Sequence, residues 1–551
     1  MPDELPPTPE TMEAEAVVAG LPDGGRGPGW LRMSHAHTAL SATLLLMAST
    51  ILSRVIGLVR EKYIAHLFGA GGQTDAYRAA FQLPEMINYF LVGGVASAAF
   101  VTILSRYREQ GREQDGEAAL ASILTMMLVV LTAGVLVAEV YARNYVAWWF
   151  NGFSPEKIAL TTHMTRILLP VQIFFFAGSV LGSVLLVRKH FAYQAITPLI
   201  YNLGIIFGGV LFARRYGISG LAYGALLGVI AGPFLLNLAG VLRVRFKLRL
   251  SLAWNHPGLR AWIKLQLPLI LGATLVTFDP WIMNHLASNG EGQIASLNYA
   301  KVLFTAPMAI LGMATSAAFM PFFASLWGQG KRTEFAAMVN STVSQTMAVA
   351  LLGTAWMIGL AQPIVNVLLR GGALHQADAT VIAAYFSVFA VSLFCWSSQA
   401  IYARAFYAAG NTLTPMVAGT VILLASLPIY WWLYRTHGAM GLAAASNIGI
   451  LMQTLAMGLL LQRAKLVPLG GLHWRELGCA LLTGLVSLML LLGMNIAHPV
   501  HGGLAANALY LAVGTVLWAG ACIALLRVMG SQLPEQLLSR LRGKRAARTT
   551  A

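Results

Sequence analysis

The sequence predicts an all-α polytopic membrane protein, and three observations lead to this fold class. Of the 551 residues, 57% are hydrophobic and 11% are charged, whereas soluble domains carry about 25% charged residues. Apolar stretches of about 20 residues, the length that a helix needs to cross the hydrocarbon core, recur along the chain. These stretches are continuous rather than alternating, and this pattern argues against a transmembrane barrel.

About fourteen stretches have the length and apolarity of a membrane-spanning helix. In chain order they are centred on Leu46–Leu67, Phe81–Leu104, Leu120–Val140, Ile167–Val187, Ile196–Ala213, Leu221–Val241, Leu267–Leu286, Val302–Phe323, Val343–Leu360, Val381–Ile401, Met416–Tyr434, Leu442–Leu461, Cys479–Ile496 and Ala506–Leu526. The 54 glycines and 22 prolines suit closely packed and locally broken membrane helices.

The two ends of the chain differ from the rest. Residues 1–36 are rich in Pro, Glu and Gly and lack an apolar core, so we expect a disordered cytoplasmic tail rather than a signal peptide. Met33 is an alternative start. Residues 531–551 form a basic tail that we expect to rest on anionic membrane lipids. Its cations are Arg540, Arg542, Lys544, Arg545 and Arg548.

Lysines and arginines are concentrated in alternate loops. The rich set comprises Arg106, Arg108, Arg112, Arg188, Lys189, Arg243, Arg245, Lys247, Arg249, Arg260, Lys264, Lys331, Arg332, Arg463, Lys465 and Arg475. The poor set comprises Arg143, Lys157, Arg214, Arg215, Arg370 and Arg435. Because cytoplasmic loops carry the excess of positive charge, the rich set predicts the cytoplasmic side and places both termini there. The net charge of +16 therefore indicates membrane orientation and no nucleic-acid partner.

An internal repeat divides the predicted helices. Thr197-Pro198 precedes Gly217–Ala222 (GISGLA), and Thr414-Pro415 precedes Gly438–Ala443 (GAMGLA) in the same order. The offset of roughly 220 residues corresponds to six helices, so the two copies share one orientation and the substrate path is expected between them. The repeat therefore predicts an N-terminal lobe at 37–245, a basic cytoplasmic linker at 246–265, a C-terminal lobe at 266–465, and two further helices at 466–530.

The first two predicted helices carry charges at membrane depth. Arg54, Arg60 and Glu61 lie in the first, and Arg78 and Glu85 at the start of the second. Such a charge costs roughly 3 kcal/mol or more on insertion scales, so these side chains should face other helices or a water-filled cavity. The residues themselves leave two interpretations equally open. The arginines bind phosphate as planar forks, or they pair with nearby acids and only hold helices together.

Asp279 lies within the seventh predicted helix, directly before Pro280. A carboxylate beside carbonyls freed by proline predicts a Na⁺ or H⁺ site. The equally weighted alternative is an ion pair with Lys301 or Arg404. The sequence contains no nucleotide-binding loop and no metal-ligand spacing. We therefore predict a protein that is not an enzyme and has no cofactor, with Na⁺ or H⁺ as possible coupling ions.

Several segments resemble one known family. They are Ser53–Glu61 (SRVIGLVRE), Phe68–Gly71 (FGAG), Thr74–Ala76 (TDA), Phe81–Pro84 (FQLP), Ala98–Leu104 (AAFVTIL), Gly371–Leu374 (GGAL) and Arg404–Pro415 (RAFYAAGNTLTP). In this order and spacing they resemble the MurJ (MviN) family of the multidrug/oligosaccharidyl-lipid/polysaccharide exporter superfamily. The resemblance extends over about residues 37–526, and the last two helices look like the pair that flanks a lipid-tail groove in that family.

The resemblance implies a function and a location. It implies that the chain flips lipid II, the undecaprenyl-linked peptidoglycan precursor, by alternating access from the cytoplasmic to the periplasmic leaflet of the bacterial inner membrane. It also implies a role in cell-wall synthesis and cell shape, with cell-wall synthesis proteins as possible partners.

The resemblance also implies a set of site residues. Arg54 and Arg60 fall on positions that line the family's central cavity, with Gly57 between them as a possible bend. Two further cavity arginines of the family are replaced here by Asn88 and Val302.

Lys301, next to Val302, is expected to supply the missing charge, so the predicted substrate-binding set is Arg54, Arg60, Asn88 and Lys301. Gly57, Glu61 and Asp75 are assigned structural or gating roles. Asp75 is expected to cap the second helix or to make a contact at the periplasmic mouth.

Two alternatives to lipid II transport stay open, and a third is disfavoured. The losses at Asn88 and Val302 suit a flippase for another undecaprenyl-linked oligosaccharide, such as an exopolysaccharide or capsule precursor. A cation-coupled exporter of small amphiphiles is the second. An intramembrane glycosyltransferase is least favoured, because it would need paired acid and base residues and usually a large external loop.

Overall fold

The computed structural model describes residues 39–92, 96–246, 251, 253, 255–271, 274–497 and 502–535. These residues form helices joined by turns, with no strand among them, as the sequence predicts. The predicted disordered tail at 1–36 and residues 536–551 of the predicted basic tail lie outside the described residues.

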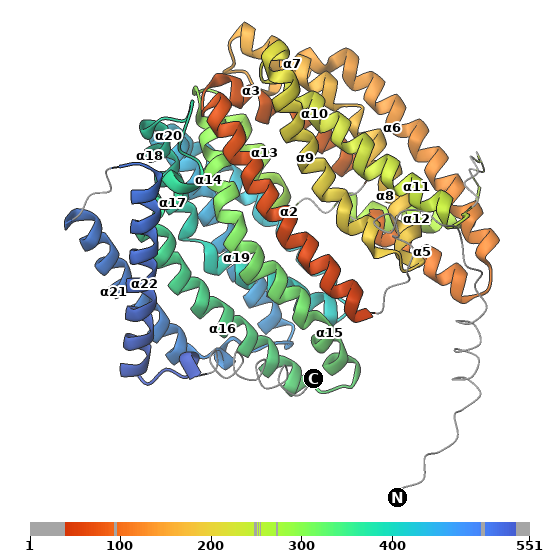
Figure 1. Cartoon of the computed structure of the whole chain (residues 1–551). Coiled ribbons are helices and arrows are strands. Elements are labelled where there is room, and N and C mark those ends of the chain that lie inside the picture. Colours follow the sequence, from red (N-terminus) through yellow and green to blue (C-terminus); the bar gives the residue numbers. More distant parts are fainter. Residues whose placement is uncertain are drawn as a thin grey trace, which may run out of the picture.

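The first group of helices precedes residue 272. It comprises α2 (Ala39–Phe68), α3 (Gly72–Ala80), α4 (Gln82–Ile87), a π-helix (Asn88–Val92), α5 (Ala96–Glu109), α6 (Glu113–Trp149), α7 (Pro155–Leu168), α8 (Val171–Val187), α9 (Phe191–Tyr216), α10 (Ser219–Val229), a second π-helix (Ile230–Leu236), α11 (Asn237–Arg243) and α12 (Pro257–Leu271). In Figure 1, α5–α12 lie on one side of α2. The predicted linker is partly helical, because α12 begins at Pro257 and packs on α5 and α6.

The second group follows residue 273, and most of its helices lie on the other side of α2 (Figure 1). It comprises α13 (Leu275–Ala287), α14 (Gln293–Met308), a third π-helix (Ala309–Ala314), α15 (Thr315–Gly328), α16 (Arg332–Gly359), α17 (Ala361–Leu368), α18 (Gln376–Ala390), α19 (Leu393–Ala408), α20 (Leu413–Arg463), a 3-10 turn (Leu469–Gly471), α21 (Trp474–Ala497) and α22 (Leu504–Val528). Helices α21 and α22 pack against α16 and α17 at the outer edge of this group.

Over the residues that the structure describes, each of the fourteen predicted stretches coincides with a helix or a run of consecutive helices. By length and composition alone, nine helices of the described chain could cross a membrane, or ten if α18 and α19, bent by 45°, count as one span. The charged helix α2 is not among the nine. One of the nine, α20, consists of two helices that meet at a kink at Gly438, and each half contains one predicted span. The division into lobes therefore remains a prediction.

The repeated Gly-x-x-Gly-Leu-Ala motif has the same backbone geometry in both copies. Gly217 has φ 56° and ψ −141°, and Gly438 has φ 57° and ψ −142°. Only glycine adopts this region without strain, which explains why each copy begins with one. After each turn the chain folds back on the preceding helix, and a Cβ on Gly441 would lie 2.0 Å from the Leu433 carbonyl oxygen.

Small residues also bring neighbouring helices together. Helices α9 and α10 touch through glycines, and a Cβ on Gly208 would lie 2.3 Å from the Cα of Gly224. Such close backbone approach is how helices associate in a membrane, where apolar burial provides little drive. Helix α9 in turn packs along α2, so it fixes the helix that carries the predicted site.

The two groups of helices are joined at one end. There the Ala373 amide donates to the His66 carbonyl at 2.8 Å. The Tyr299 hydroxyl donates to the Gly69 carbonyl at 3.2 Å, and the Lys62 ammonium donates to the Val367 carbonyl at 2.7 Å. The loops at this end belong to the Lys/Arg-poor set, which the sequence assigns to the periplasm.

Candidate functional site

A hollow of about 490 Å³ lies between the two groups of helices, and we call it the arginine hollow. Its lining residues come from α2, α9 and α14 and are Thr50, Ser53, Arg54, Gly57, Leu58, Arg60, Glu61, Pro198, Asn202, Val302, Thr305 and Ala306. The structure therefore brings the two predicted arginines to one cavity wall.

Arg54 is the cation of this hollow whose side chain is available to a ligand. Its side chain is exposed, and no hydrogen bond or ion pair joins it to another described residue. An arginine presents five N–H donors in a planar fork that matches a phosphate. A guanidinium without a protein partner inside a cavity can therefore bind an anionic group of a ligand.

Arg60 has protein partners instead. Its guanidinium contacts Glu61 at 2.6 Å and donates to the Asn202 side-chain oxygen at 2.9 Å. Glu61 is 1% exposed and also pairs with Arg78. Arg60 therefore has the acid partner that the structural interpretation expects, and it also lines the hollow.

Sequence reasoning did not find the roles of Arg78 and Asn202. Arg78 places its guanidinium 5.3 Å from the ring of Tyr299, which lies in the second group of helices. It therefore links Glu61 on α2 to α14. The only available signal was the presence of Arg78 at membrane depth.

Gly57 forms part of the cavity wall rather than a bend. Helix α2 continues through it without interruption, and a Cβ placed on Gly57 would meet no heavy atom within 4 Å. The bend that the sequence suggested is absent.

A second hollow of about 450 Å³ is lined in part by Tyr201, the residue before Asn202, and we call it the aromatic hollow. Its lining residues are Phe81, Pro84, Glu85, Asn88, Tyr89, Leu168, Val171, Gln172, Phe175, Tyr201, Thr277, Pro280 and Trp281. Asn88 lies here and donates to the Gln172 side-chain oxygen at 2.7 Å. Asn88 and Arg54 therefore line different hollows, which flank neighbouring residues of α9.

Lys301 does not line either hollow. Its ammonium pairs with the buried carboxylate of Asp279, and the Tyr430 hydroxyl donates to the other oxygen of that carboxylate. Val302, the next residue, is the one in the wall of the arginine hollow, because one step along a helix turns a side chain by about 100°. The expectation that Lys301 supplies the missing cavity charge is therefore wrong, and the ion-pair alternative for Asp279 holds with Lys301.

Asp75 caps a helix, but not the expected one. Its fully buried carboxylate accepts from the amide of Gly292 at 2.7 Å and from the amide of Ala295 at 2.8 Å. These amides belong to the start of α14. The same carboxylate pairs with Lys157 on α7 at 3.1 Å. Asp75 therefore joins α3 and α7 to the second group of helices and caps α14 rather than its own helix.

We expect Asp75→Ala to loosen this joined end. Each lost hydrogen bond to the charged carboxylate contributes about 1.5–3 kcal/mol. The fraction of molecules in which the two helix groups are separated at this end should therefore rise by at least about tenfold. A cysteine at the buried position Ala70 should then react faster with a membrane-impermeant thiol reagent. Asp378→Ala is the matched control, because Asp378 bonds the His375 amide within its own group of helices. Equal labelling rates in parent and Asp75→Ala would show that Asp75 is not part of the gate.

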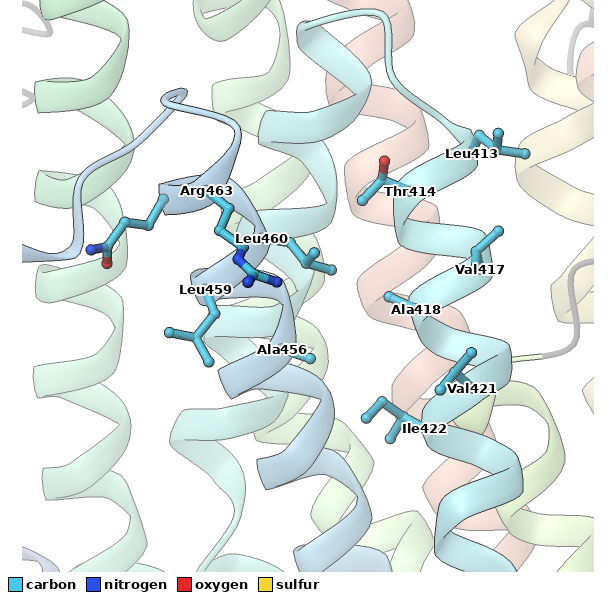
Figure 2. A pocket seen from close by; sticks show the side chains of 11 residues that line it. Leu413, Thr414, Val417, Ala418, Val421, Ile422, Ala456, Leu459, Leu460 and Arg463 are labelled. Atoms are coloured by element: carbon cyan, nitrogen blue, oxygen red, sulfur yellow. The ribbon is translucent and has the colours of Figure 1, made fainter.

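A third hollow, of about 950 Å³, lies within the second group, where the two halves of α20 run side by side. Figure 2 shows its apolar walls, with Val417, Val421 and Leu459 among them, and Arg463 and Thr414 near one end. The walls suit an acyl chain, and the arginine suits an anionic headgroup at the end of the helix.

Comparisons with known proteins agree on one family. A family model described as lipid II flippase MurJ matches residues 64–517. A probable lipid II flippase MurJ of Buchnera aphidicola is 27% identical over 426 residues, which cover 76% of this chain and 83% of the relative. A lipid II flippase MurJ of Burkholderia cenocepacia is 26% identical over 433 residues, which cover 77% and 83%.

Solved structures share the fold. A lipid II flippase MurJ in an inward closed conformation matches with a TM-score of 0.73 at 20% identity, covering 88% of this chain and 99% of that one. An inward-facing multidrug resistance MATE family transporter of the MOP superfamily matches with a TM-score of 0.64 at 14% identity, covering 77% and 98%. At these identities the likeness concerns the fold alone.

Proposed function

This chain belongs to the lipid II flippase MurJ family, and from that membership we propose that it carries lipid II from the cytoplasmic to the periplasmic leaflet. The observation that supports this most is the arginine hollow between the two groups of helices, where the Arg54 guanidinium pairs with no residue of the described ranges. A diphosphate-linked lipid headgroup is an anion that such a fork binds. The protein is a transporter, and its part in the reaction is to bind and to change conformation.

Alternating access requires that the two groups separate at one end and close at the other. At the joined end the contacts to be broken include Asp75 with α14 and Ala373 with His66. We propose that these contacts form the periplasmic gate. Substrate binding at Arg54 would favour the conformation in which this gate opens, since a ligand shifts an equilibrium by its differential affinity for the two states.

We place the Lys/Arg-rich loops and both termini in the cytoplasm of a bacterium, with the protein in its inner membrane. The excess of positive charge supports this orientation. With it, the arginine at the end of the third hollow, Arg463, faces the anionic headgroups of the cytoplasmic leaflet. We therefore propose anionic lipids as a second class of partner.

For the coupling ion we propose a proton rather than Na⁺. Both carboxylate oxygens of Asp279 already have partners, one in the Lys301 ammonium and one in the Tyr430 hydroxyl. A metal cation would have to displace that ammonium, whereas a proton can transfer between groups that are already bonded.

The test is transport in proteoliposomes under a pH gradient or a Na⁺ gradient. We expect the wild type to respond to the pH gradient alone. The double variant Asp279→Asn/Lys301→Met should insert normally and lose that response, because neither a carboxylate nor an ammonium remains. Asp279→Asn alone should be less stable than the double variant, because it leaves a buried ammonium without its partner. A response of the wild type to Na⁺, or a retained pH response in the double variant, would contradict proton coupling.

A flippase for another undecaprenyl-linked oligosaccharide is the second candidate. It is favoured by Asn88 and Val302, which stand where the family resemblance places cavity arginines. Depletion of the chain in its host separates the two. Accumulation of lipid II on the cytoplasmic side supports lipid II transport, and loss of an exopolysaccharide or capsule alone supports the second candidate.

A further inference from the structure

Glu85 differs from the other acids at the interface between the helix groups. Glu61, Asp75 and Asp279 each pair with a lysine or arginine. Glu85 lines the aromatic hollow with an exposed side chain, and no cation pairs with it in the described part of the chain. Among the described residues that line this hollow, it is also the only charged one. A carboxylate at this depth is costly unless a partner compensates it.

Aromatic rings line the same hollow as this carboxylate. The ring of Tyr89 lies 5.8 Å from that of Trp281, and the ring of Phe175 lies 5.5 Å from that of Tyr201. Trp281 and Glu85 line the same hollow. Aromatic faces attract ammonium groups through their quadrupoles, and a carboxylate adds a charge-assisted hydrogen bond. The hollow therefore has the chemistry of a site for a protonated amine.

The neighbouring cations do not neutralise this site. Arg78, which acts on Glu85 from a distance, is bound to Glu61. Asn88 and Gln172 are neutral and hydrogen-bond each other. The arginine hollow and the aromatic hollow thus present opposite charges, and they flank the adjacent residues Asn202 and Tyr201 of α9.

We propose that the aromatic hollow binds a protonated primary amine of the transported headgroup while Arg54 binds its phosphates. This inference rests on the proposed function and specifies it further. On lipid II the group concerned is the free side-chain amine of the diamino acid in the stem peptide. Sugar hydroxyls can also stack on aromatic rings, but they need a hydrogen-bond acceptor rather than a net charge, and a glutamine would serve them equally well.

The test compares two probes: lipid II with a free lysine amine in the stem peptide, and the same molecule acetylated at that amine. Their affinities for the full chain in nanodiscs are measured for the wild type and for Glu85→Gln. We expect the wild type to bind the free amine about tenfold or more tightly than the acetylated form. Glu85→Gln should bind both forms equally, with the affinity that the wild type has for the acetylated one.

Two control variants make the result specific. Arg54→Ala should weaken both probes by the same factor and keep the preference for the free amine. Glu139→Gln removes an acid that pairs with Arg166 on other helices, and it should change neither affinity. If Glu85 only balanced the charge of Arg78, Glu85→Gln would weaken both probes alike and the preference would persist.

Three outcomes would overturn the inference. Equal affinity of the wild type for the two probes removes the amine site and leaves lipid II as substrate. A preference that survives Glu85→Gln removes Glu85 from the site. Failure of the wild type to bind either probe contradicts the proposed function itself, and the amine site falls with it.

Discussion

Replacing Arg54 by alanine is expected to lower lipid II transport by about tenfold to a hundredfold, since a charge-assisted contact contributes about 1.5–3 kcal/mol. The amount of protein in the membrane should not change, because Arg54 pairs with none of the residues that the structure describes. Arg54→Lys should restore transport only partly, because an ammonium keeps the charge but loses the planar fork. Transport and membrane level are measured together in a complementation assay.

The matched control is Arg166→Ala. Arg166 also lies within a helix, and its Nε is 3.8 Å from a carboxylate oxygen of Glu139. It lines neither the arginine hollow nor the aromatic hollow. The Arg166→Ala variant should transport lipid II at the wild-type rate. Full transport by Arg54→Ala at the normal protein level would contradict phosphate binding at this residue.

The largest loss of stability is expected for Glu61→Gln. Glu61 is 1% exposed and pairs with Arg60 and Arg78 at once. Removing one partner of a buried ion pair leaves an uncompensated charge and costs about 3–5 kcal/mol. The thermal unfolding midpoint of the purified protein should fall, and so should its level in the membrane.

A second substitution tests the cause of that loss. Glu61→Gln/Arg78→Gln should recover part of the unfolding midpoint, because one of the two stranded guanidinium groups is gone. An unfolding midpoint equal to that of the parent in Glu61→Gln would show that the Arg60–Glu61–Arg78 cluster does not hold α2 to its neighbours.

Much of the fold follows from composition and spacing alone. Continuous apolar runs locate the helices because every backbone polar group inside a bilayer must bond within its own helix. The π-helices at Asn88–Val92 and Ala309–Ala314 and the extended backbone of Thr274 before α13 could not be predicted in this way. They depend on neighbouring helices that compensate the disturbed backbone, which a linear pattern does not contain.

The site was predictable in part. Charges at membrane depth identified α2 as the wall of a cavity, and Arg54 lies there. The direction of a single side chain was harder, because Lys301 and Val302 differ by one step on a helix and face different surroundings. The partners of Asp75, Gly292 and Ala295, lie more than two hundred residues away in sequence. Only the packing of the two helix groups brings them together.

The most direct measurement is lipid II flipping by the full chain in proteoliposomes, followed by the appearance of the headgroup in the opposite leaflet. We expect liposomes with the wild type to expose lipid II faster than protein-free liposomes, and liposomes with Arg54→Ala to do so about tenfold or more slowly than the wild type. A rate equal to that of protein-free liposomes under a pH gradient, or equal rates for wild type and Arg54→Ala, would contradict lipid II transport through the arginine hollow.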